Sequence, residues 1–355
     1  MNDRRSNVMI MAGGTGGHIF PGLAVAEALQ RHRADISWLG TPSGLENRLV
    51  PAAGIELDRI TISGLRGRGW LGWLAAPWRV SRAMLQARRI LKRRRPRCVL
   101  SLGGYVAGPG ALAARLMGIP LVIHEQNAIA GLTNRLLRPL ARRVLTGFPD
   151  TLAGGEPVGN PVRADIAALA PPSERMAGRS GPLRMLVIGG SLGASAFSEV
   201  VPRALARLPE SDRPRVVHQA GRQYEATRQA YDDAGVEGDV REFVEDMAGA
   251  WAEADLAICR AGALTVAELS AAGVAAVLVP FPHAVDDHQR ANARFLSDAG
   301  AAWLIDQREF TASRLAGILA GTDRTELLEM ARRARERARD DSAERVAAAC
   351  MEVMA

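Results

Sequence analysis

The sequence predicts an α/β protein with two domains, each built on a parallel sheet that helices cover on both faces. Three observations indicate this fold class. Short apolar runs alternate with longer helical runs along the 355 residues. The order strand, glycine-rich loop, helix occurs twice, at Gly13–Gly17 and again at Gly189–Gly193. A stretch rich in Pro, Gly and Ala, from about Asp150 to Gly181, separates the two series and is expected to connect the domains.

The first series begins with a strand at Val8–Ala12, directly before the first glycine loop. Because proline fits the first turn of a helix, Pro21 is expected to start the next helix, which continues through Leu23–Leu29. The same alternation predicts strands at Ile36–Leu39, Cys98–Leu102, Leu121–His124 and Arg143–Thr146, and helices at Val80–Arg94 and Pro109–Leu116.

The second series predicts six strands, at Arg184–Ile188, Val216–Gln219, Val240–Phe243, Leu256–Cys259, Ala275–Val279 and Ala302–Ile305. One long, arginine-rich amphipathic helix is expected over about Thr325–Met354. The predicted domains are therefore residues 1–162 and 163–340, with a helix end at 341–355 that could return to the N-terminal domain.

Composition excludes several classes of protein. Hydrophobic residues make up 48% of the chain and charged residues 23%, which excludes a disordered tail or a collagen. The three cysteines lie far apart without a CxxC pair, so a disulfide scaffold is excluded and a reducing cytoplasm fits better. No apolar run reaches the ~18–20 residues of a membrane-spanning helix, and the polar N-terminus lacks the apolar core of a signal peptide.

Positive charge is concentrated in the N-terminal half. Residues 1–162 carry 22 Lys and Arg against 9 Asp and Glu, whereas residues 163–355 carry 23 against 29. Trp70, Trp73 and Trp78 lie among the arginines of this half, a pattern that suits an anionic membrane surface. A solvated basic helix with its tryptophans in the core would give the same pattern. Aromatic residues make up only 5% of the chain and no base-stacking motif is present, so no nucleic-acid role is predicted.

The glycine loops match neither common nucleotide-binding fingerprint. The pattern GxGxxG fails after Gly16 because Ile19 occupies the last position, and the P-loop lysine is missing because Lys92 is the only lysine. Nicotinamide and P-loop chemistry are therefore disfavoured, and no cofactor is predicted. A strand, loop and helix in this order still present backbone N–H groups to a ligand phosphate. The alternative is a tight turn that lets strand and helix pack closely.

Polar residues follow two predicted strands of the N-terminal half. His18 ends the first glycine loop, where an imidazole with a pKa near 7 suits a general base. His124, Glu125, Gln126 and Asn127 end another strand, at the edge of the sheet where ligands bind. Structural roles, as loop anchors or phosphate contacts, remain alternatives for both groups. Metal binding by His124 and Glu125 is disfavoured because neighbouring strand residues point to opposite faces.

Two segments of the C-terminal half carry polar chemistry. Glu268 falls in the first or second turn of a helix and suits a ribose diol, or else stabilises the helix N-terminus. The segment Pro280–Asn292 holds acids, histidines and amides that would suit either a metal or sugar hydroxyls.

Seven motifs stand in the same order as in a known family. They are GGTGGH, SGLRG (Ser63–Gly67), GGYxxGP (Gly103–Pro109), HEQN, GNPVR (Gly159–Arg163), GGSxGA and RAGALTVAE. Over nearly the whole chain the sequence resembles the MurG family, N-acetylglucosaminyltransferases that convert lipid I to lipid II in peptidoglycan synthesis. The resemblance implies the GT-B fold, in which two Rossmann-like domains face a cleft. It also implies UDP-N-acetylglucosamine (UDP-GlcNAc) as donor, inversion without an essential metal, and peripheral attachment to the cytoplasmic face of the membrane.

The resemblance also implies site residues. Gly13–His18 matches the acceptor-side loop, with His18 as the first candidate base and Glu125 as the second. Gln289 matches the second of two paired polar residues, although His288 replaces the usual first. Carried over by position, the donor site comprises Thr15, Gly16, Gly17, Asn127, Arg163, Ser191, Val244, Ala263, Leu264, Thr265, Val266, Ala267, Glu268 and Gln289.

Three rival functions remain open on the sequence. A UDP-sugar 2-epimerase would share the fold and donor but would leave the tryptophan-rich segment unexplained. A glycolipid synthase would share the fold and the membrane surface. A membrane-docking scaffold without enzymatic activity would bind no nucleotide.

Overall fold

The structure, a computed structural model, describes residues 7–14, 16–62, 76–190 and 193–354. Two compact units make up the chain. The first comprises residues up to Arg163 together with those from Arg339, and the second comprises Ala164–Ala338. Trp70, Trp73, Thr15 and Ser191 lie outside the described residues.

The first unit is built on a parallel sheet with seven strands among the described residues. Their order across the sheet is β3 (Glu56–Arg59), β2 (Asp35–Gly40), β1 (Asn7–Met11), β4 (Cys98–Ser101), β5 (Leu121–Glu125), β6 (Arg143–Thr146) and β7 (Glu156–Pro157). The strands at its centre are short apolar runs because helices bury both of their faces.

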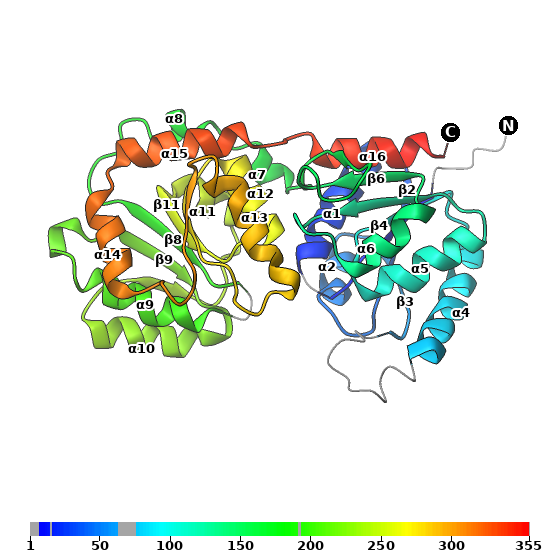
Figure 1. Ribbon diagram of the computed structural model, residues 1–355, viewed down its shortest axis with the longest axis horizontal. Helices are drawn as coiled ribbons and strands as arrows, with labels where there is room; N and C mark the ends of the chain where they lie inside the picture. The colour runs from blue at the N-terminus through cyan, green and yellow to red at the C-terminus, as the bar shows by residue number, and fades with distance from the viewer. Residues whose placement is uncertain (1–6, 15, 63–75, 191–192, 355) are drawn as a thin grey trace. The chain divides into compact units, whose positions relative to one another are not determined.

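Helices cover both faces of this sheet (Figure 1): α1 (Gly16–Arg31), α2 (Glu46–Ala52), α4 (Ala76–Arg94), α5 (Gly104–Leu116), α6 (Leu132–Leu137), η1 (Arg138–Leu140) and α16 (Ser342–Glu352). Alternate residues of β1 divide between two apolar clusters. Val8 and Ile10 join the cluster that includes α1 and α16, whereas Met9 and Met11 join the cluster that includes α4 and α5. The C-terminal helix is thus part of the core of the first unit.

The second unit repeats the plan with a six-stranded parallel sheet. Its order is β10 (Asp239–Arg241), β9 (Arg215–Gln219), β8 (Arg184–Ile188), β11 (Leu256–Cys259), β12 (Ala275–Leu278) and β13 (Ala302–Leu304). The helices are α7 (Ala164–Ala167), α8 (Pro172–Arg175), α9 (Ser195–Leu205), η2 (Glu210–Asp212), η3 (Gly221–Gln223), α10 (Tyr224–Ala234), α11 (Met247–Glu253), α12 (Ala263–Ala272), η4 (Val285–Asp287), α13 (His288–Ser297), α14 (Ala312–Gly321) and α15 (Arg324–Glu336).

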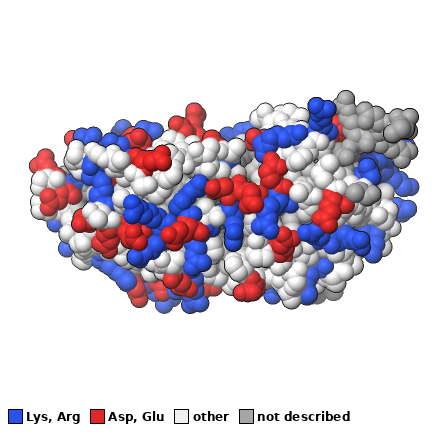
Figure 2. Space-filling view, turned by 90° about the horizontal axis from the view of Figure 1, so that it is seen from above, with Lys and Arg blue, Asp and Glu red and all other residues white. Residues whose placement is uncertain are grey.

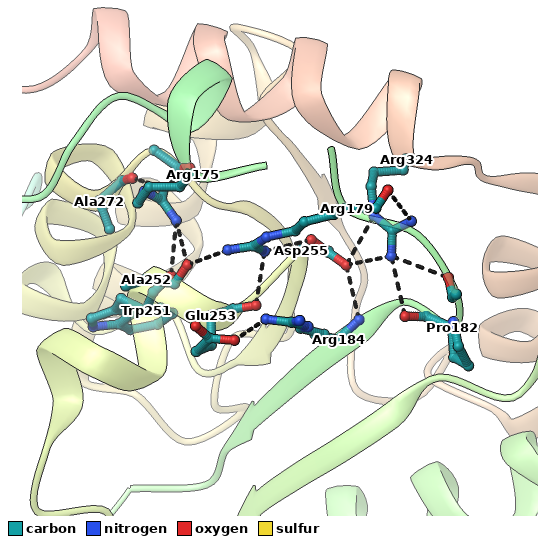
Figure 3. Close-up of polar contacts among 12 residues, drawn as sticks. Arg175, Arg179, Pro182, Arg184, Trp251, Ala252, Glu253, Asp255, Ala272 and Arg324 are labelled. Carbon is teal, nitrogen blue, oxygen red and sulfur yellow. Dashed lines mark hydrogen bonds and ion pairs between the residues drawn. The ribbon is translucent and has the colours of Figure 1, made fainter. Parts of the chain in front are cut away.

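A fully buried carboxylate, Asp255, ties the early segments of the second unit together (Figure 3). It accepts hydrogen bonds from Arg179 Nη1 at 2.7 Å, Arg324 Nη2 at 3.0 Å and the backbone N–H of Arg184 at 3.0 Å. A buried charge is stable only when it is paired and hydrogen-bonded, as this one is. The stretch from Asp150 to Gly181, predicted to connect the domains, therefore belongs in part to the second unit. The loop after α8 is fixed there by the bond between Arg179 and Asp255.

Each predicted strand lies within one or two residues of an observed one, but β3 and β7 were not predicted. Helix α4 begins at Ala76 rather than at Val80, and three further helix predictions are wrong. Helix α1 begins at Gly16, so Pro21 lies inside it, and α5 begins at Gly104 rather than at Pro109. The long C-terminal helix is two helices, α15 and α16, since the chain passes from the second unit to the first between Ala338 and Arg339. The hydroxyl of Ser342 anchors the start of α16 by donating to Val158 O at 2.9 Å.

Candidate active site

Each sheet has a point where its strand order reverses, between β1 and β4 in the first unit and between β8 and β11 in the second. Successive elements then run outward in opposite directions and leave a crevice at the carboxyl ends of the strands. Ligands of open parallel sheets bind in this crevice. The residues that follow these four strands therefore form the candidate site of each unit.

Two helix N-termini meet at the crevice of the first unit. Helix α1 starts directly after the β1 loop, and α5 starts after Gly103, which caps it with a φ of 88°. Neither helix has an acidic residue in its first turn. A Cβ atom on Gly104 would lie 3.5 Å from the carbonyl oxygen of Gly13, so the two loops touch. Two positive helix ends suit a phosphate or pyrophosphate.

Glu46 holds the glycine loop from behind and was missed by the sequence analysis. Its side chain is fully buried and accepts from Gly14 N at 3.1 Å, Thr41 N at 2.9 Å and Thr41 Oγ1 at 2.6 Å. Burial acts to raise its pKa, but the hydrogen bonds from Thr41 and Gly14 outweigh burial and hold the pKa below its usual value. A Cβ atom on Gly13 would lie 2.8 Å from Glu46 Oε1, so a larger residue there would displace this carboxylate from its hydrogen bonds.

His18 lies in the first turn of α1 and is half-buried. Its Nε2 atom is 3.6 Å from the position that a Cβ atom would take on Gly103. The imidazole thus lies beside the α5 N-terminus, where the two loops meet. Of the neighbouring predicted residues, Gly16 is half-buried and Gly17 is exposed.

His124 is a structural residue. It is fully buried, and burial lowers its pKa, so the ring is neutral. Its Nε2 lies 2.9 Å from Gly159 O, which can only accept, so Nε2 carries the proton. The other ring nitrogen, Nδ1, then accepts from Gln126 Nε2 at 3.2 Å. The ring therefore anchors the loop of the GNPVR motif rather than taking part in chemistry.

Glu125 is surrounded by donors. Its carboxylate accepts from Asn127 N at 3.0 Å, Asn127 Nδ2 at 3.2 Å, Gly131 N at 3.0 Å and Asn134 Nδ2 at 2.9 Å. It is buried, so these bonds fix the loop after β5 and with it Asn127. These four donors occupy both carboxylate oxygens, so a substrate hydroxyl would have to displace one of them to reach Glu125. Arg163, at the end of the unit, has its guanidinium 6.0 Å from the ring centre of Phe20 in α1.

One helix N-terminus dominates the crevice of the second unit. Helix α12 begins at Ala263 after Gly262, with no side-chain cap and no acidic residue in its first turn. Its first amides, on Ala263, Leu264 and Thr265, therefore lie at a positive helix end. The β8 loop is a tight turn, since a Cβ atom on Gly189 would lie 2.7 Å from Ala194 N.

The remaining predicted donor residues follow neighbouring strands of this sheet. Glu268 lies in the second turn of α12, is half-buried and accepts from Trp251 Nε1 at 3.2 Å. Val244, after β10, is buried and its N–H donates to Gln219 Oε1 at 3.0 Å. Gln289, in α13, accepts from the N–H of Phe281 at 2.9 Å. Val266 is buried and Ala267 half-buried within α12.

Arg260 begins the RAGALTVAE motif, but no role was predicted for it. It stacks on Phe197 and Phe281, with its guanidinium 4.9 Å and 5.5 Å from the two ring centres, and burial lowers its pKa. Its Nη2 donates to Gln307 at 2.7 Å. This residue fixes the loop that carries Phe281 and so supports Gln289. No group of three or more His, Cys, Asp or Glu suited to a metal occurs among the described residues, so the metal interpretation of Pro280–Asn292 finds no support there.

Helix α4 carries the described part of the predicted membrane surface. Trp78 is 72% exposed and Leu85 57% exposed, on a helix that ends in Lys92, Arg93 and Arg94. On the face shown in Figure 2, by contrast, basic and acidic side chains are interspersed. Across the described ranges, no helix combines the length and the apolar character needed to cross a membrane.

Two parallel-sheet units, each with a crevice at its reversal point, give the GT-B fold, and the family models show that the protein is a glycosyltransferase. Models of the glycosyltransferase family 28 N-terminal and C-terminal domains match residues 8–146 and 184–346. The chain belongs to glycosyltransferase family 28.

Named relatives agree with this assignment. A protein of Alkalilimnicola ehrlichii is 59% identical over 97% of this chain and 98% of its own, and one of Bordetella petrii is 57% identical over 97% and 96%. Both are called UDP-N-acetylglucosamine--N-acetylmuramyl-(pentapeptide) pyrophosphoryl-undecaprenol N-acetylglucosamine transferase.

Solved structures give the same result. The crystal structure of Acinetobacter baumannii MurG matches with a TM-score of 0.85 and 45% identity, covering 98% of this chain and 99% of that one. The resemblance to the MurG family and the GT-B fold are therefore confirmed. A UDP-GlcNAc 2-epimerase from Neisseria meningitidis matches with a TM-score of 0.66 at 12% identity over 98% of this chain and 99% of its own, which shows the shared fold alone.

Proposed function

We propose that the protein transfers GlcNAc from UDP-GlcNAc to the muramyl 4-hydroxyl of undecaprenyl-pyrophosphoryl-MurNAc-pentapeptide, lipid I, and so makes lipid II for peptidoglycan. The observation that carries this proposal is near full-length identity of 53–59% to proteins named for this reaction. The helix N-termini at the two crevices, α1 and α5 in the first unit and α12 in the second, suit the pyrophosphate groups that both substrates carry.

The second unit is the proposed donor domain. The α12 N-terminus, with Ala263, Leu264 and Thr265, would bind the UDP pyrophosphate, and Glu268 would accept hydrogen bonds from the ribose hydroxyls. The other donor residues that the family resemblance implies in this unit are Val244, Gln289, Val266, Ala267 and Ser191. Those that it implies in the first unit are Asn127, Arg163, Thr15, Gly16 and Gly17. No cofactor or metal is part of the proposal, because helix ends and Arg163 can stabilise the departing pyrophosphate.

The first unit is the proposed acceptor domain. The α1 and α5 N-termini would bind the pyrophosphate of the lipid, and His18 lies beside both. The muramyl 4-hydroxyl attacks the anomeric carbon of GlcNAc on the face opposite UDP. The new C–O bond forms as the bond to UDP breaks, which inverts the configuration and gives a β-linkage. His18 takes the hydroxyl proton as general base. Glu125 is the second candidate, disfavoured because donors already surround it.

The α4 surface would dock the enzyme peripherally on the cytoplasmic face of the membrane, where its lipid substrate lies. Exposed apolar side chains beside a run of basic residues are the combination that anionic lipid surfaces attract.

The experiment is transfer of labelled GlcNAc from UDP-GlcNAc to a lipid I analogue. The proposal predicts labelled product that requires both substrates. A 2-epimerase would convert the donor without any acceptor, and a glycolipid synthase would require diacylglycerol instead. A scaffold without activity would bind no UDP-GlcNAc in calorimetry, and any of these results would overturn the proposal.

A further inference from the structure

We propose that Trp251 is a positioning residue for donor recognition: its indole N–H orients the Glu268 carboxylate toward the ribose. This inference rests on the proposed role of Glu268 as the ribose-binding group. It adds a residue that none of the sequence motifs includes, on a helix other than the one that carries Glu268.

The contact joins two neighbouring helices. Trp251 lies in α11 and is fully buried, and its Nε1 donates to Glu268 Oε2 in α12 at 3.2 Å. An indole has one polar atom, a donor, and a buried indole N–H needs an acceptor. The acceptor here is a charged and half-buried carboxylate rather than a nearby backbone carbonyl. A hydrogen bond to a charged group is also stronger than one between neutral groups.

One arginine also fixes the C-terminal ends of the same two helices (Figure 3). Arg175 Nη1 donates to Trp251 O at 3.3 Å and to Ala252 O at 2.9 Å, near the end of α11. Its Nη2 donates to Gly273 O at 3.0 Å and to Ala272 O, at the end of α12. The guanidinium is planar and rigid, so it holds the two helix ends in a fixed relation. Backbone movement between Trp251 and Glu268 is thereby restricted.

The consequence concerns the rotamers of one side chain. A glutamate on a helix surface samples several rotamers, and ordering it for a ligand costs conformational entropy. A donor that holds one carboxylate oxygen in advance removes part of this cost, as second-layer hydrogen bonds do at other binding sites. The ribose hydroxyls then meet a carboxylate that is already oriented.

The test measures ribose selectivity, the ratio of kcat/KM for UDP-GlcNAc to kcat/KM for donors that lack the ribose 2′- or 3′-hydroxyl. Trp251 is replaced by 3-benzothienylalanine, which keeps the shape of the ring and has sulfur in place of the N–H. Trp251→Phe is the second variant, and Glu268→Ala reports on the carboxylate itself. Trp303→Phe is the matched control, because Trp303 packs against the apolar core of the same unit. A ratio taken on one preparation is insensitive to the fraction of folded enzyme.

The parent is expected to select for the intact ribose by about 10- to 100-fold, the scale of a hydrogen bond to a charged group. Glu268→Ala should reduce the selectivity to near 1, and both Trp251 variants should reduce it by roughly 3- to 10-fold through a higher KM, with little change in kcat. Trp303→Phe should match the parent. If the Trp251 variants keep the parent selectivity while Glu268→Ala loses it, the positioning role is wrong and the ribose role stands. If Glu268→Ala keeps the selectivity, both assignments are wrong.

Discussion

Each unit has a glutamate close to its crevice, Glu46 in α2 after β2 and Glu268 in α12 after β11, and the two serve different purposes. In the first unit, Glu46 lies behind the glycine loop, fully buried, with three donors on its oxygens. In the second, Glu268 lies in the second turn of the helix at the crevice and is half-buried. The first carboxylate shapes the backbone that meets the ligand, whereas the second is proposed to meet the ligand itself. Exposure, more than residue type, therefore separates a supporting acid from a binding one.

The largest effect should come from His18→Ala, which removes the proposed general base from the acceptor site of the first unit. Turnover is expected to fall about 100-fold or more, the scale of general base catalysis, while the Kd for UDP-GlcNAc changes little. His32→Ala is the control, since His32 is exposed and bonded to Glu344. The parent's activity should also fall on the acid side near the pKa of a histidine. A His18→Ala variant that keeps this acid limb would show that another group is the base.

Glu268→Ala should weaken the donor side alone. Loss of a hydrogen bond to a charged group costs roughly 1.5–3 kcal/mol, so KM for UDP-GlcNAc should rise about 10- to 100-fold with KM for the lipid acceptor unchanged. Steady-state kinetics with each substrate varied in turn measures both constants. An unchanged KM for UDP-GlcNAc would show that Glu268, like Glu46, only supports the structure, and the two carboxylates would then not differ in role.

Glu46→Gln should weaken the acceptor side through the backbone. The amide of glutamine replaces one carboxylate oxygen with an NH2 group. Because both oxygens of Glu46 accept hydrogen bonds, at least one buried donor is then left unpaired, at a cost of about 1–3 kcal/mol of unfolding free energy. KM for the acceptor should rise more than KM for UDP-GlcNAc, because the loop that Glu46 holds carries the acceptor-side helix start and only a minor part of the proposed donor set. Denaturant unfolding combined with kinetics checks both, and a rise in donor KM of equal size would contradict the division of labour between units.

The α4 surface gives a smaller effect, confined to lipid binding. Trp78→Ser together with Leu85→Ser should reduce binding to anionic vesicles several-fold, and added salt should weaken binding by the parent. Phe243→Ser is the control, because Phe243 is an exposed aromatic residue of the second unit. Co-sedimentation at two salt concentrations measures this. Equal binding by the α4 variant and the parent would leave α4 as ordinary solvated surface.

The smallest effect concerns the pH dependence of stability. Burial lowers the pKa of His218 to about 4, from an ordinary value near 6.5, so the folded ring stays neutral. The unfolded chain binds a proton below about pH 6.5 and the folded chain does not. Stability is therefore highest above that pH and falls as the pH drops toward 4.

Between pH 7.5 and 5.5 His218 should account for roughly 1 kcal/mol of lost stability. Denaturant unfolding of the parent and of His218→Phe at both pH values measures this share. His124, whose pKa burial also lowers, contributes with the same sign in the first unit and remains in both proteins. A His218→Phe variant with the full pH dependence of the parent would assign the loss elsewhere.

Periodicity and glycine position predicted most of the fold. Apolar runs such as Leu256–Cys259 are buried on both faces, so their pattern alone marks a central parallel strand. The helix starts at Gly16 and Gly104 were missed because the prediction took proline as the first residue of a helix and glycine as part of the preceding loop. In the structure, glycine at these helix starts lets the two loops approach each other closely. The break between α15 and α16 was missed because both helices share one amphipathic pattern, and only the division into units separates them.

The site residues that the sequence missed act across long separations. Glu46 bonds to Gly14, 32 residues earlier, and Trp251 to Glu268, 17 residues later and on another helix. No motif spacing encodes either contact. One signal was available for Glu46: glycines at positions 13, 40 and 44 leave room for one buried side chain, which the sequence analysis did not consider.

The most direct test of the account is the linkage in the product. Purified enzyme is incubated with UDP-GlcNAc carrying ¹³C at the anomeric carbon and with a lipid I analogue, and the product is analysed by NMR. Inverting transfer from the second unit to an acceptor held by the first predicts a β-linkage to the muramyl 4-hydroxyl, formed only when both substrates are present. An α-linkage, attachment at another hydroxyl, or conversion of the donor without the acceptor would contradict the account.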